Sequence, residues 1–452
     1  MTGSHKAEII VIGGGAAGMM AAAGASQTFR NAGRSESVVI LEKMPRPGRK
    51  IMITGKGRCN FSNVKPWNEF SSHIHPKANF LKASFHNLTP ERLMDFFSQN
   101  GMDSLIERGD RAFPTSQLSS EVVDTLVRAA ENYGAELHCG KEVCNINQAK
   151  DGSFDLLCSD GSRYSCRRLI ICTGGLSYPK TGSSGDGYGW AKEMGHSIRP
   201  LFPSLTALVP KGYKDMHPAV EKTSRGHIDR NTPLSELGRI LCGNQLKNIE
   251  IRVEIDGNVA QSEFGDLDFT DGGMEGPVGF RISRKCVNAL INGSKVCASL
   301  DLKPAVEQEA LHQRIKTVWD EICRDRRNAG RQYKERFRIL LGKLMPQSLI
   351  AAFMHMNPNI DHNSLAKVLK NWKFEFEGYV GYERCVITAG GVSLDEITAK
   401  TLESRLIPGL YFAGEILDMD ADTGGYNLHI AFSTGYLAGI SAAKKVQETD
   451  PV

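Results

Sequence analysis

Buried strands and small-residue helices alternate at the N-terminal end of the chain. Residues 8–12 and 38–41 are short apolar runs rich in β-branched side chains, and such runs predict strands buried on both faces of a sheet. Residues 19–28, which lie between them, are rich in alanine and predict a helix. The three segments together predict a βαβ unit.

The pattern continues with one amphipathic helix and several strands. Apolar side chains recur at helical spacing over 120–133, which predicts a helix with one buried face. Short β-like pieces and a further buried strand follow at 135–139, 142–147, 154–158 and 169–172. Asp-Gly pairs at 151–152 and 160–161 predict hairpin turns, so the pieces form a β-meander before the buried strand.

The middle of the chain differs from its two ends. Short β-like pieces separated by Gly and Pro fill residues 200–300, and charged helical segments follow over 305–375. A buried strand at 410–413 and a small-residue helix over 424–443 then return to the N-terminal style. The simplest architecture is a doubly wound, mainly parallel α/β domain built from both chain ends, with an insertion of about 180 residues.

A glycine pattern follows the first predicted strand. Gly13-x-Gly15-x-x-Gly18 comes directly before the predicted helix, and Glu42 ends the second strand. In this context Gly13 permits a tight turn, Gly15 lets a pyrophosphate approach the backbone, and Gly18 allows close packing of helix on strand. The helix N-terminus would face the phosphates, and Glu42 would accept hydrogen bonds from a ribose. The unit therefore predicts a dinucleotide-binding site.

The fingerprint alone does not separate NAD from FAD. The β-meander precedes a strand that ends at Thr173-Gly174-Gly175, and the last strand ends at Gly414-Glu415. This layout resembles the glutathione-reductase-like FAD proteins. In that fold the last strand brings an acid to the ribityl chain, and the following helix points its N-terminus at the flavin ring.

Longer motifs are more specific. They lie at 48–50, 54–63, 109–114, 173–179, 182–188, 388–392, 409–418 and 424–427, in order along nearly the whole chain. The block Thr54-Gly-Lys-Gly-Arg-Cys-Asn-Phe-Ser-Asn63 is the longest of them. Together they resemble the signature of a bacterial NAD(P)/FAD-dependent oxidoreductase family, the BaiN-like or YhiN-like flavoproteins, which includes proteins described as aminoacetone oxidases.

The resemblance implies a glutathione-reductase-like FAD-binding domain with an inserted β-barrel-like domain and a small helical domain. We expect the FAD domain at 1–198 and 378–452, the β-rich substrate domain at 199–304 and 345–377, and the helical part at 305–344. It also implies non-covalent FAD. Family members are described as reductases of conjugated ketones in bile-acid precursors, as aminoacetone oxidases, or as uncharacterised flavoproteins.

The fingerprint and the resemblance together predict a set of cofactor-binding residues. The set comprises Gly13, Gly15, Ala16, Ala17, Gly18, Glu42, Lys43, Arg49, Lys50, Thr54, Gly57, Arg58, Cys59, Asn60, Val143, Thr173, Gly174, Gly175, Gly414, Glu415, Gly424, Gly425, Tyr426 and Asn427. Within it, Gly424 and Gly425 would open the helix that stabilises negative charge on the reduced flavin through its N–H groups and dipole. Arg49, Lys50 and Arg58 would pair with the pyrophosphate or hold the loop around the flavin.

The sequence departs from the family pattern at two places. The middle block has Asp271 where His is usual and Glu275 where Ser is usual, and the C-terminal block has Asp420-Ala-Asp422 where a Gly is common. If the inserted domain lines the substrate site, the first departure bears on whether the substrate is shared with the family.

Reduction of a conjugated ketone needs a proton donor as well as a hydride donor. Tyr178, Tyr426 and His429 lie in or near the flavin blocks and are the candidate catalytic residues, with none singled out by spacing. Cys59 also lies there, but no C-x-x-C partner accompanies it, so packing of the loop is expected rather than thiol chemistry.

Composition narrows the picture further. Gly accounts for 46 of 452 residues, and the main clusters fall in the blocks described above. The 55 basic and 51 acidic residues give a net charge of only +4, which provides no case for a nucleic-acid or membrane-surface partner. Eleven cysteines without C-x-x-C spacing indicate reduced thiols rather than a metal site or disulfides. We expect a cytoplasmic monomer or homodimer without a signal peptide or transmembrane helix.

The sequence therefore predicts a flavin-dependent oxidoreductase acting on a small molecule. The favoured activity is NAD(P)H-driven reduction of an activated C=C bond in a hydrophobic ketone of steroid or bile-acid-precursor type. No second GxGxxG unit is present, so the nicotinamide would bind transiently at the flavin. Alternatives are an oxidase of a small amine or α-aminoketone that produces peroxide, and a non-catalytic flavin-binding redox sensor.

Overall fold

The computed structural model describes residues 4–216 and 226–449. The chain divides into two compact units, one formed by residues 1–202 with 387–452 and the other by 203–386. These borders differ from the expected ones at 198/199 and 377/378. The second expected border would fall inside strand β18 (Trp372–Val380), which the structure assigns whole to the inserted unit.

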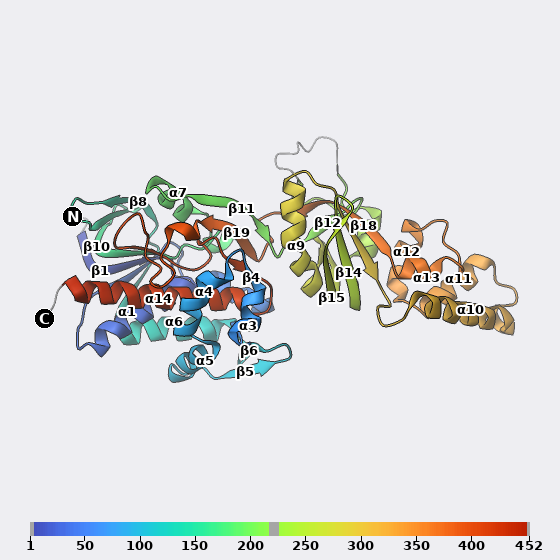
Figure 1. Ribbon diagram of the computed structural model, residues 1–452, viewed down its shortest axis with the longest axis horizontal. Helices are drawn as coiled ribbons and strands as arrows, with labels where there is room; N and C mark the ends of the chain where they lie inside the picture. Colours follow the sequence, from blue (N-terminus) through green and yellow to red (C-terminus); the bar gives the residue numbers. More distant parts are fainter. Residues whose placement is uncertain (1–3, 217–225, 450–452) are drawn as a thin grey trace. The chain divides into compact units, whose positions relative to one another are not determined.

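The first unit is built on one seven-stranded sheet (Figure 1). Its strands are β7 (Ala135–Cys139), β2 (Val38–Glu42), β1 (Ser4–Ile12), β10 (Arg163–Ile171), β9 (Phe154–Cys158) and β8 (Val143–Gln148) in spatial order, with β20 (Leu410–Phe412) also paired to β10. The pairs β7–β2, β2–β1, β1–β10 and β10–β20 are parallel, whereas β10–β9 and β9–β8 are antiparallel. A parallel core with a meander at one edge confirms the expected fold class.

One expected strand has a different place. The piece at 135–139 was grouped with the meander, but it pairs in parallel with β2 at the opposite edge of the sheet. Helix α6 (Ser119–Tyr133) provides the reason, because it packs against α1 and leads into β7, which returns beside β2 as a crossover connection.

Two helices run side by side along one face of this sheet, as Figure 1 shows. They are α1 (Ala16–Asn31) and α14 (Tyr426–Thr449), and both are largely buried. A Cβ atom at Gly435 would lie 2.2 Å from the Ala17 carbonyl oxygen, and one at Gly439 would lie 1.9 Å from that of Ala21. Only glycine permits this approach, which brings the first and last helices of the unit into direct backbone contact.

Smaller elements complete the first unit. They are α2 (Arg49–Met52), α3 (Trp67–Phe70), α4 (Ala78–Asn87), α5 (Pro90–Gln99), α7 (Asp186–Glu193), the sheet of β3 (Ser62–Asn63), β6 (Arg111–Pro114) and β5 (Ser104–Glu107), the pair β4 (Ile74–His75) and β21 (Asp420–Ala421), and the pair β11 (Ile198–Ser204) and β19 (Ile387–Val392). The pairing of β4 with β21 joins segments that are far apart in sequence, and it places residues 73–75 beside the loop that precedes α14.

The second unit contains a closed barrel of six strands and confirms the expected β-barrel insertion. The strands are β12 (Leu208–Pro210), β16 (Gly273–Glu275), β15 (Asn258–Thr270), β14 (Gln245–Ile255), β17 (Val296–Asp301) and β18, and β18 pairs back with β12. The short β13 (His227–Ile228) adds to β18 in parallel, while α9 (Gly276–Ile291) packs against the barrel strands and α8 (Glu236–Leu241) contacts helix α12.

A group of helices lies at one end of this barrel (Figure 1). It comprises α10 (Gln308–Arg324), α11 (Tyr333–Gly342), α12 (Ile350–Met356) and α13 (Leu365–Leu369), with the short 3₁₀ turn Arg326–Asn328 between α10 and α11. Apolar side chains from α10 and α11, including Leu311, Ile315, Phe337 and Leu340, form its interior.

Candidate cofactor and substrate site

The loop between β1 and α1 has the shape of a phosphate cradle. Gly13 has φ 103°, and a Cβ there would lie 2.5 Å from the Cys172 carbonyl oxygen. A Cβ at Gly18 would lie 1.8 Å from the Gly13 oxygen, whereas one at Gly15 would meet no atom within 4 Å. Gly15 is also the N-cap of α1 and makes no side-chain cap. The backbone N–H groups of the first turn therefore remain available to an anion.

Glu42 is fixed at the end of β2. Its carboxylate accepts hydrogen bonds from the backbone N–H groups of Gly14, at 2.6 Å, and Met44, at 2.7 Å. Burial raises the pKa of this carboxyl, and the two N–H groups act against that rise. The carboxylate thus stands next to the phosphate cradle, where the fingerprint expects an acceptor for a ribose.

A second carboxylate lies at the ends of β10, β19 and β20. Glu415 accepts hydrogen bonds from Ser177 Oγ at 2.5 Å and from the Thr388 backbone N–H at 2.9 Å, and Lys50 Nζ lies 2.5 Å from its other oxygen. Lys50 also contacts Ser177 Oγ. Lys50 therefore pairs with Glu415, which accords with the second of its two expected roles, holding the loop.

Two buried polar atoms near these residues have no hydrogen-bond partner among the described residues. They are Asn60 Oδ1 and Thr173 Oγ1. Asn60 faces the start of α14, since a Cβ at Gly425 would lie 2.8 Å from Asn60 Oδ1 and 2.2 Å from the Ser62 carbonyl oxygen. An unpaired buried acceptor costs about 1–3 kcal/mol unless a ligand satisfies it. Together with the open cradle at Gly15, the unpaired Asn60 Oδ1 fits an extended polar cofactor, whereas Thr173 Oγ1 faces α7, where a Cβ at Gly187 would lie 2.2 Å from it.

Several other expected cofactor residues are held by the protein itself. Arg58 pairs with Glu107, donates to Gln117 Oε1 at 2.5 Å, and lies over the Phe113 ring at 4.5 Å. Because its guanidinium is bound on that side, Arg58 stabilises the loop through these contacts, which accords with the second of its two expected roles, holding the loop. Lys43 similarly pairs with Asp186, at 2.6 Å.

The remaining expected residues lie around the same loops. Arg49 is exposed at the start of α2 and acts on the charge of Glu42. Thr54 Oγ1 donates to the Ile51 carbonyl oxygen at 2.7 Å, and Val143 is buried where β8 pairs with Cys158. The other members adjoin residues already described: Ala16 and Ala17 begin α1, Gly57 precedes Arg58, Gly174 and Gly175 follow Thr173, Gly414 precedes Glu415, and Gly424 adjoins Gly425.

Cys59 is fully buried in this loop. It has φ 57°, and burial raises the pKa of its thiol to about 12. All eleven cysteines lie within the described residues and are free. A thiol that stays protonated is a poor nucleophile, so the site offers packing at this position rather than thiolate chemistry.

The three candidate proton donors have different surroundings. His429 is fully buried, its Nδ1 lies 2.9 Å from Ser62 Oγ, and burial lowers its pKa to about 3. Tyr426 is the first residue of α14, and burial raises its pKa to about 12. Tyr178 is half-buried with φ 52°. A neutral, fully buried His429 is unsuited to deliver a proton to a substrate. The hydroxyl groups of Tyr178 and Tyr426 are still candidate proton donors.

The structure adds a pair that the sequence pattern did not reveal. His73 Nδ1 lies 2.8 Å from Asp422 Oδ2, and the His73 ring stacks on Tyr426 with centroids 4.4 Å apart. His75 Nε2 lies 3.6 Å from the other oxygen of Asp422. Burial would raise the pKa of Asp422, but the hydrogen bonds with the two histidines lower it to about 2. The only sequence signal was the departure at Asp420-Ala-Asp422.

Asn427 helps to hold that loop. Its side chain donates to the Ala421 carbonyl oxygen at 2.7 Å and accepts from the Ala421 N–H at 2.8 Å. The loop that carries Asp422 is therefore fixed to the first turn of α14, and His73 is fixed beside the N-terminus of that helix.

The unusual acids of the middle block share one partner in the second unit. Arg384 Nε lies 2.5 Å from Glu275 Oε1, and Nη1 lies 2.6 Å from Asp271 Oδ1. Arg384 also donates to Thr270 Oγ1 at 3.2 Å. Glu275 is buried and Asp271 is exposed. Both negative charges are thus balanced by one guanidinium, which ties β16 to the loop after β18.

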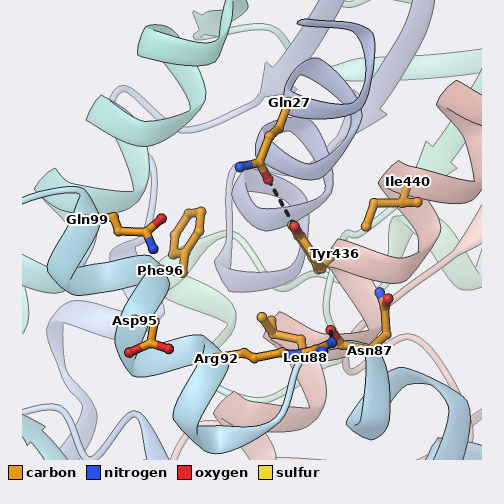
Figure 2. A pocket seen from close by; sticks show the side chains of 9 residues that line it. All are labelled: Gln27, Asn87, Leu88, Arg92, Asp95, Phe96, Gln99, Tyr436 and Ile440. Carbon is orange, nitrogen blue, oxygen red and sulfur yellow. Dashed lines mark hydrogen bonds between the residues drawn. The ribbon is translucent and has the colours of Figure 1, made fainter. Parts of the chain in front are cut away.

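A cavity of about 350 Å³ lies elsewhere in the first unit. Figure 2 shows its walls, which come from α1, α4, α5 and α14 and include Gln27, Arg92, Phe96 and Tyr436. Tyr436 donates to Gln27 Oε1 at 2.9 Å across it. None of the expected cofactor residues lines this cavity, so it is separate from the phosphate cradle.

The sequence can now be set beside known proteins. A family model described as HI0933-like protein Rossmann domain matches residues 7–441. The chain belongs to the HI0933-like family. Membership confirms the expected BaiN-like or YhiN-like relationship and a Rossmann-type FAD-dependent oxidoreductase.

Curated relatives match almost end to end. A 3-dehydro-bile acid delta(4,6)-reductase of Clostridium scindens is 28% identical, over 96% of this chain and 98% of its own. A ribosomal RNA dihydrouridine synthase of Escherichia coli is also 28% identical, over 96% and 97%. A second protein of that name, from Haemophilus influenzae, is 26% identical over 98% and 100%.

Solved structures resemble the chain more distantly. A 3-ketosteroid-Δ4-(5α)-dehydrogenase of Rhodococcus jostii is 14% identical with a TM-score of 0.48, over 97% of each chain. A flavocytochrome c3 fumarate reductase is 16% identical with a TM-score of 0.47, over 97% of this chain and 78% of its own. Within the described residues, no helix is long and apolar enough to cross a membrane.

Proposed function

We propose that the protein is an FAD-dependent reductase of a C=C bond conjugated to a carbonyl group, with NAD(P)H as the electron donor. The observation that carries the proposal is the convergence of the Gly15 cradle, the Glu415–Lys50 pair and the N-terminus of α14 in one unit of a flavoprotein family. FAD would be held without a covalent bond by the α1 loop with Glu42, by Asn60 and Glu415, and by the first turn of α14.

Each part of the site has a distinct task. The first turn of α1 binds the pyrophosphate, Glu42 binds the adenosine ribose, and Glu415 orients the ribityl chain. The N–H groups at Gly425 and Tyr426 stabilise negative charge on the ring system. When bound, FAD would supply the hydride-transfer chemistry between NAD(P)H and the β-carbon of the double bond.

The α-carbon of the substrate must receive a proton, and we propose His73 as its source. Asp422 holds His73 through Nδ1, which leaves Nε2 as the nitrogen that can exchange a proton with substrate. About 30% of the His73 side chain is exposed, so solvent can reprotonate it. Tyr426, stacked on His73, is the second candidate for this role.

The relatives suggest two substrate classes for the same chemistry. The bile-acid reductase is named for a steroid ketone, in which the double bond is conjugated to the carbonyl. Dihydrouridine differs from uridine by two hydrogens across a ring double bond that is likewise conjugated to a carbonyl. An apolar ketone is the first candidate here, and a uridine in RNA is the second, favoured by the basic residues described in the next section.

An anaerobic experiment tests the proposal. The oxidised holoprotein is mixed with NADH or NADPH, and the visible absorption band of the oxidised flavin is followed. We expect bleaching within seconds to minutes, and reoxidation on addition of a steroid enone or of uridine-containing RNA. Failure of both nucleotides to bleach the flavin would contradict the reductase proposal. Release of peroxide with amines, without any nicotinamide, would favour the oxidase alternative.

A further inference from the structure

The modest net charge of the chain conceals a local concentration of basic residues. Residues 324–343 contain eight Lys or Arg and two acidic residues. This segment runs from the end of α10 through the 3₁₀ turn to the end of α11. This excess of six positive charges exceeds the net charge of +4 of the entire chain, so the net charge of the chain does not describe this region.

Seven of these basic side chains are exposed; Arg327 pairs with Asp325, and the other six form what we call the basic corner. Its members are Arg324, Arg326, Arg331, Lys334, Arg338 and Lys343. Within the described part of the chain, none of the six makes an ion pair with a carboxylate. The two acids of the segment are engaged otherwise, since Asp325 pairs with Arg327 at 2.8 Å and Glu335 caps α11 through the Gln332 N–H at 2.9 Å.

The basic corner is held in a fixed arrangement. Arg336 donates to the carbonyl oxygens of Asn328, at 3.2 Å, and Ala329, at 3.1 Å, which ties the turn to α11. The buried Asn328 side chain donates to the Ile322 carbonyl oxygen at 3.1 Å, which ties the same turn to α10. The exposed cations therefore project from a scaffold rather than from a loose tail, and less entropy is lost when they bind an anion.

An aromatic side chain stands among these cations. Tyr333 lies between Arg331 and Lys334 in sequence and is 45% exposed. Its hydroxyl lies 3.2 Å from His362 Nδ1, and the His362 ring stacks on Trp319 with centroids 4.7 Å apart. A held, half-exposed ring beside arginines is a platform on which an unpaired base can stack.

We propose that the basic corner, with Tyr333, is a docking surface for structured RNA. The cations would bind the phosphodiester backbone and Tyr333 would stack on an exposed base. The aromatic platform favours RNA over an acidic protein or an anionic membrane, and two relatives carry the name of enzymes acting on ribosomal RNA. The inference rests on the proposed function only for the step in which a docked uridine would be reduced, because docking is measured without turnover.

The test uses the oxidised holoprotein without reductant and fluorescently labelled fragments of ribosomal RNA. Affinity is measured by anisotropy across a range of salt concentrations. The test variant neutralises Arg331, Lys334 and Arg338 as Gln. The matched control neutralises Lys82, Lys150 and Lys247 as Gln, three exposed lysines outside the basic corner. Far-UV circular dichroism and chemical denaturation verify that both variants fold.

We expect the test variant to bind RNA at least tenfold more weakly at physiological salt, with a slope of log K against log salt smaller by about 2 to 3, because roughly 0.7–0.9 counterions are released per phosphate contact. Tyr333→Ala should weaken binding about tenfold while Tyr333→Phe should not, since stacking contributes about 1–3 kcal/mol per base. The control should bind like the wild type.

Three results would overturn the docking surface: no RNA binding by the wild type at physiological salt, equal binding by the test variant and the wild type, or equal displacement by polyglutamate or phosphatidylglycerol vesicles of matched charge. Flavin reduction by NADPH is measured on the same samples. If NADPH does not reduce the flavin but RNA still binds, only the proposed function is contradicted. If NADPH reduces the flavin but RNA does not bind, only the docking surface is contradicted.

Discussion

At the residue scale, Glu415 joins three segments that are distant in the sequence. Lys50 comes from α2, Ser177 from the loop after β10, and Thr388 from β19. Hydrogen bonds to a charged group contribute about 1.5–3 kcal/mol each, so this carboxylate has a well-defined position before any ligand arrives. A preorganised acceptor of this kind is suited to the hydroxyl groups of a ribityl chain.

Replacement of Glu415 by Ala should weaken FAD binding by about 10- to 100-fold, because a charged acceptor is lost and Lys50 is left without its partner. The measurement is titration of the deflavinated protein with FAD, followed by flavin fluorescence. Glu131→Ala, at an exposed position of α6, is the control. An FAD affinity unchanged in Glu415→Ala would remove this residue from the proposed site.

Substitution of His73 by Gln should slow product formation by about 10²–10⁴-fold while leaving flavin reduction by NAD(P)H intact, because only the second half-reaction needs the proton. Asp422→Asn, acting through His73, should have a smaller effect in the same half-reaction. Stopped-flow measurement of the two half-reactions separates these outcomes. His355→Gln, at an exposed position in α12, is the control. Equal slowing of both half-reactions would point to a structural role instead.

The sequence predicted the conformation of those residues whose positions depend on their neighbours in the chain. Gly13, Gly15 and Gly18 belong to one strand–turn–helix unit, whose geometry follows from local sequence. His73 and Asp422 could not be paired in this way, since β4 and β21 are joined only by the tertiary fold. The sequence left two roles open for Arg58 for a related reason: its charge was visible in the sequence, but its partner Glu107 was not.

At the element scale, the contact of α1 with α14 determines where two helix N-termini point. Gly435 and Gly439 let the helices approach at backbone distance, and a side chain at either position would push them apart. In the proposed site, the first turn of α1 would bind the phosphates and the first turn of α14 would face the flavin ring. A change in this crossing would therefore disturb both ends of the cofactor site.

Gly439→Ala should destabilise the protein by about 1–3 kcal/mol despite the better helix propensity of Ala, because its Cβ would overlap the Ala21 carbonyl oxygen. Gly189→Ala is the matched control, since it lies in α7 with open space around it and should be neutral or stabilising by up to about 1 kcal/mol. Chemical denaturation of the two variants measures the difference. Equal stabilities would show that the helices can separate at little cost.

Arg384→Met should cost about 3–5 kcal/mol, because the buried Glu275 would lose its counter-charge. The double variant Arg384→Met with Glu275→Met should recover much of that loss, since it removes the unpaired charge as well. Guanidinium denaturation of the single and double variants gives the comparison. If the double variant is no more stable than the single one, the ion pair is not what ties β16 to the following loop.

Elements were predicted well where the spacing of their apolar residues matched one kind of secondary structure. The apolar run of β1 and the amphipathic face of α6 both carry their structure in their periodicity. The position of β7 in the sheet could not be predicted in this way, because a short strand has the same pattern of apolar residues whichever strand it pairs with. Connection through α6 decided it, and that is a property of chain topology.

At the scale of the whole molecule, the net charge and the distribution of charge along the chain lead to different conclusions. A net charge of +4 over 452 residues suggested no affinity for nucleic acid, yet one short helical segment carries an excess of six positive charges. The three-part organisation was predicted because family motifs span the chain in order. The basic corner was not predicted, because the sequence alone does not show which side chains of these helices are buried and which are exposed.

The pairing of β10 with β20 sets an order of events during synthesis. Leu169 and Leu410 are partners, so about 240 residues must be translated after β10 before its neighbour exists, which takes on the order of 10–50 s at typical bacterial rates. The barrel strands all emerge within that interval, whereas β20, Glu415 and α14 come last. A nascent chain therefore exposes one edge of a parallel sheet for many seconds, and the proposed flavin site stays incomplete until β20, Glu415 and α14 have been translated.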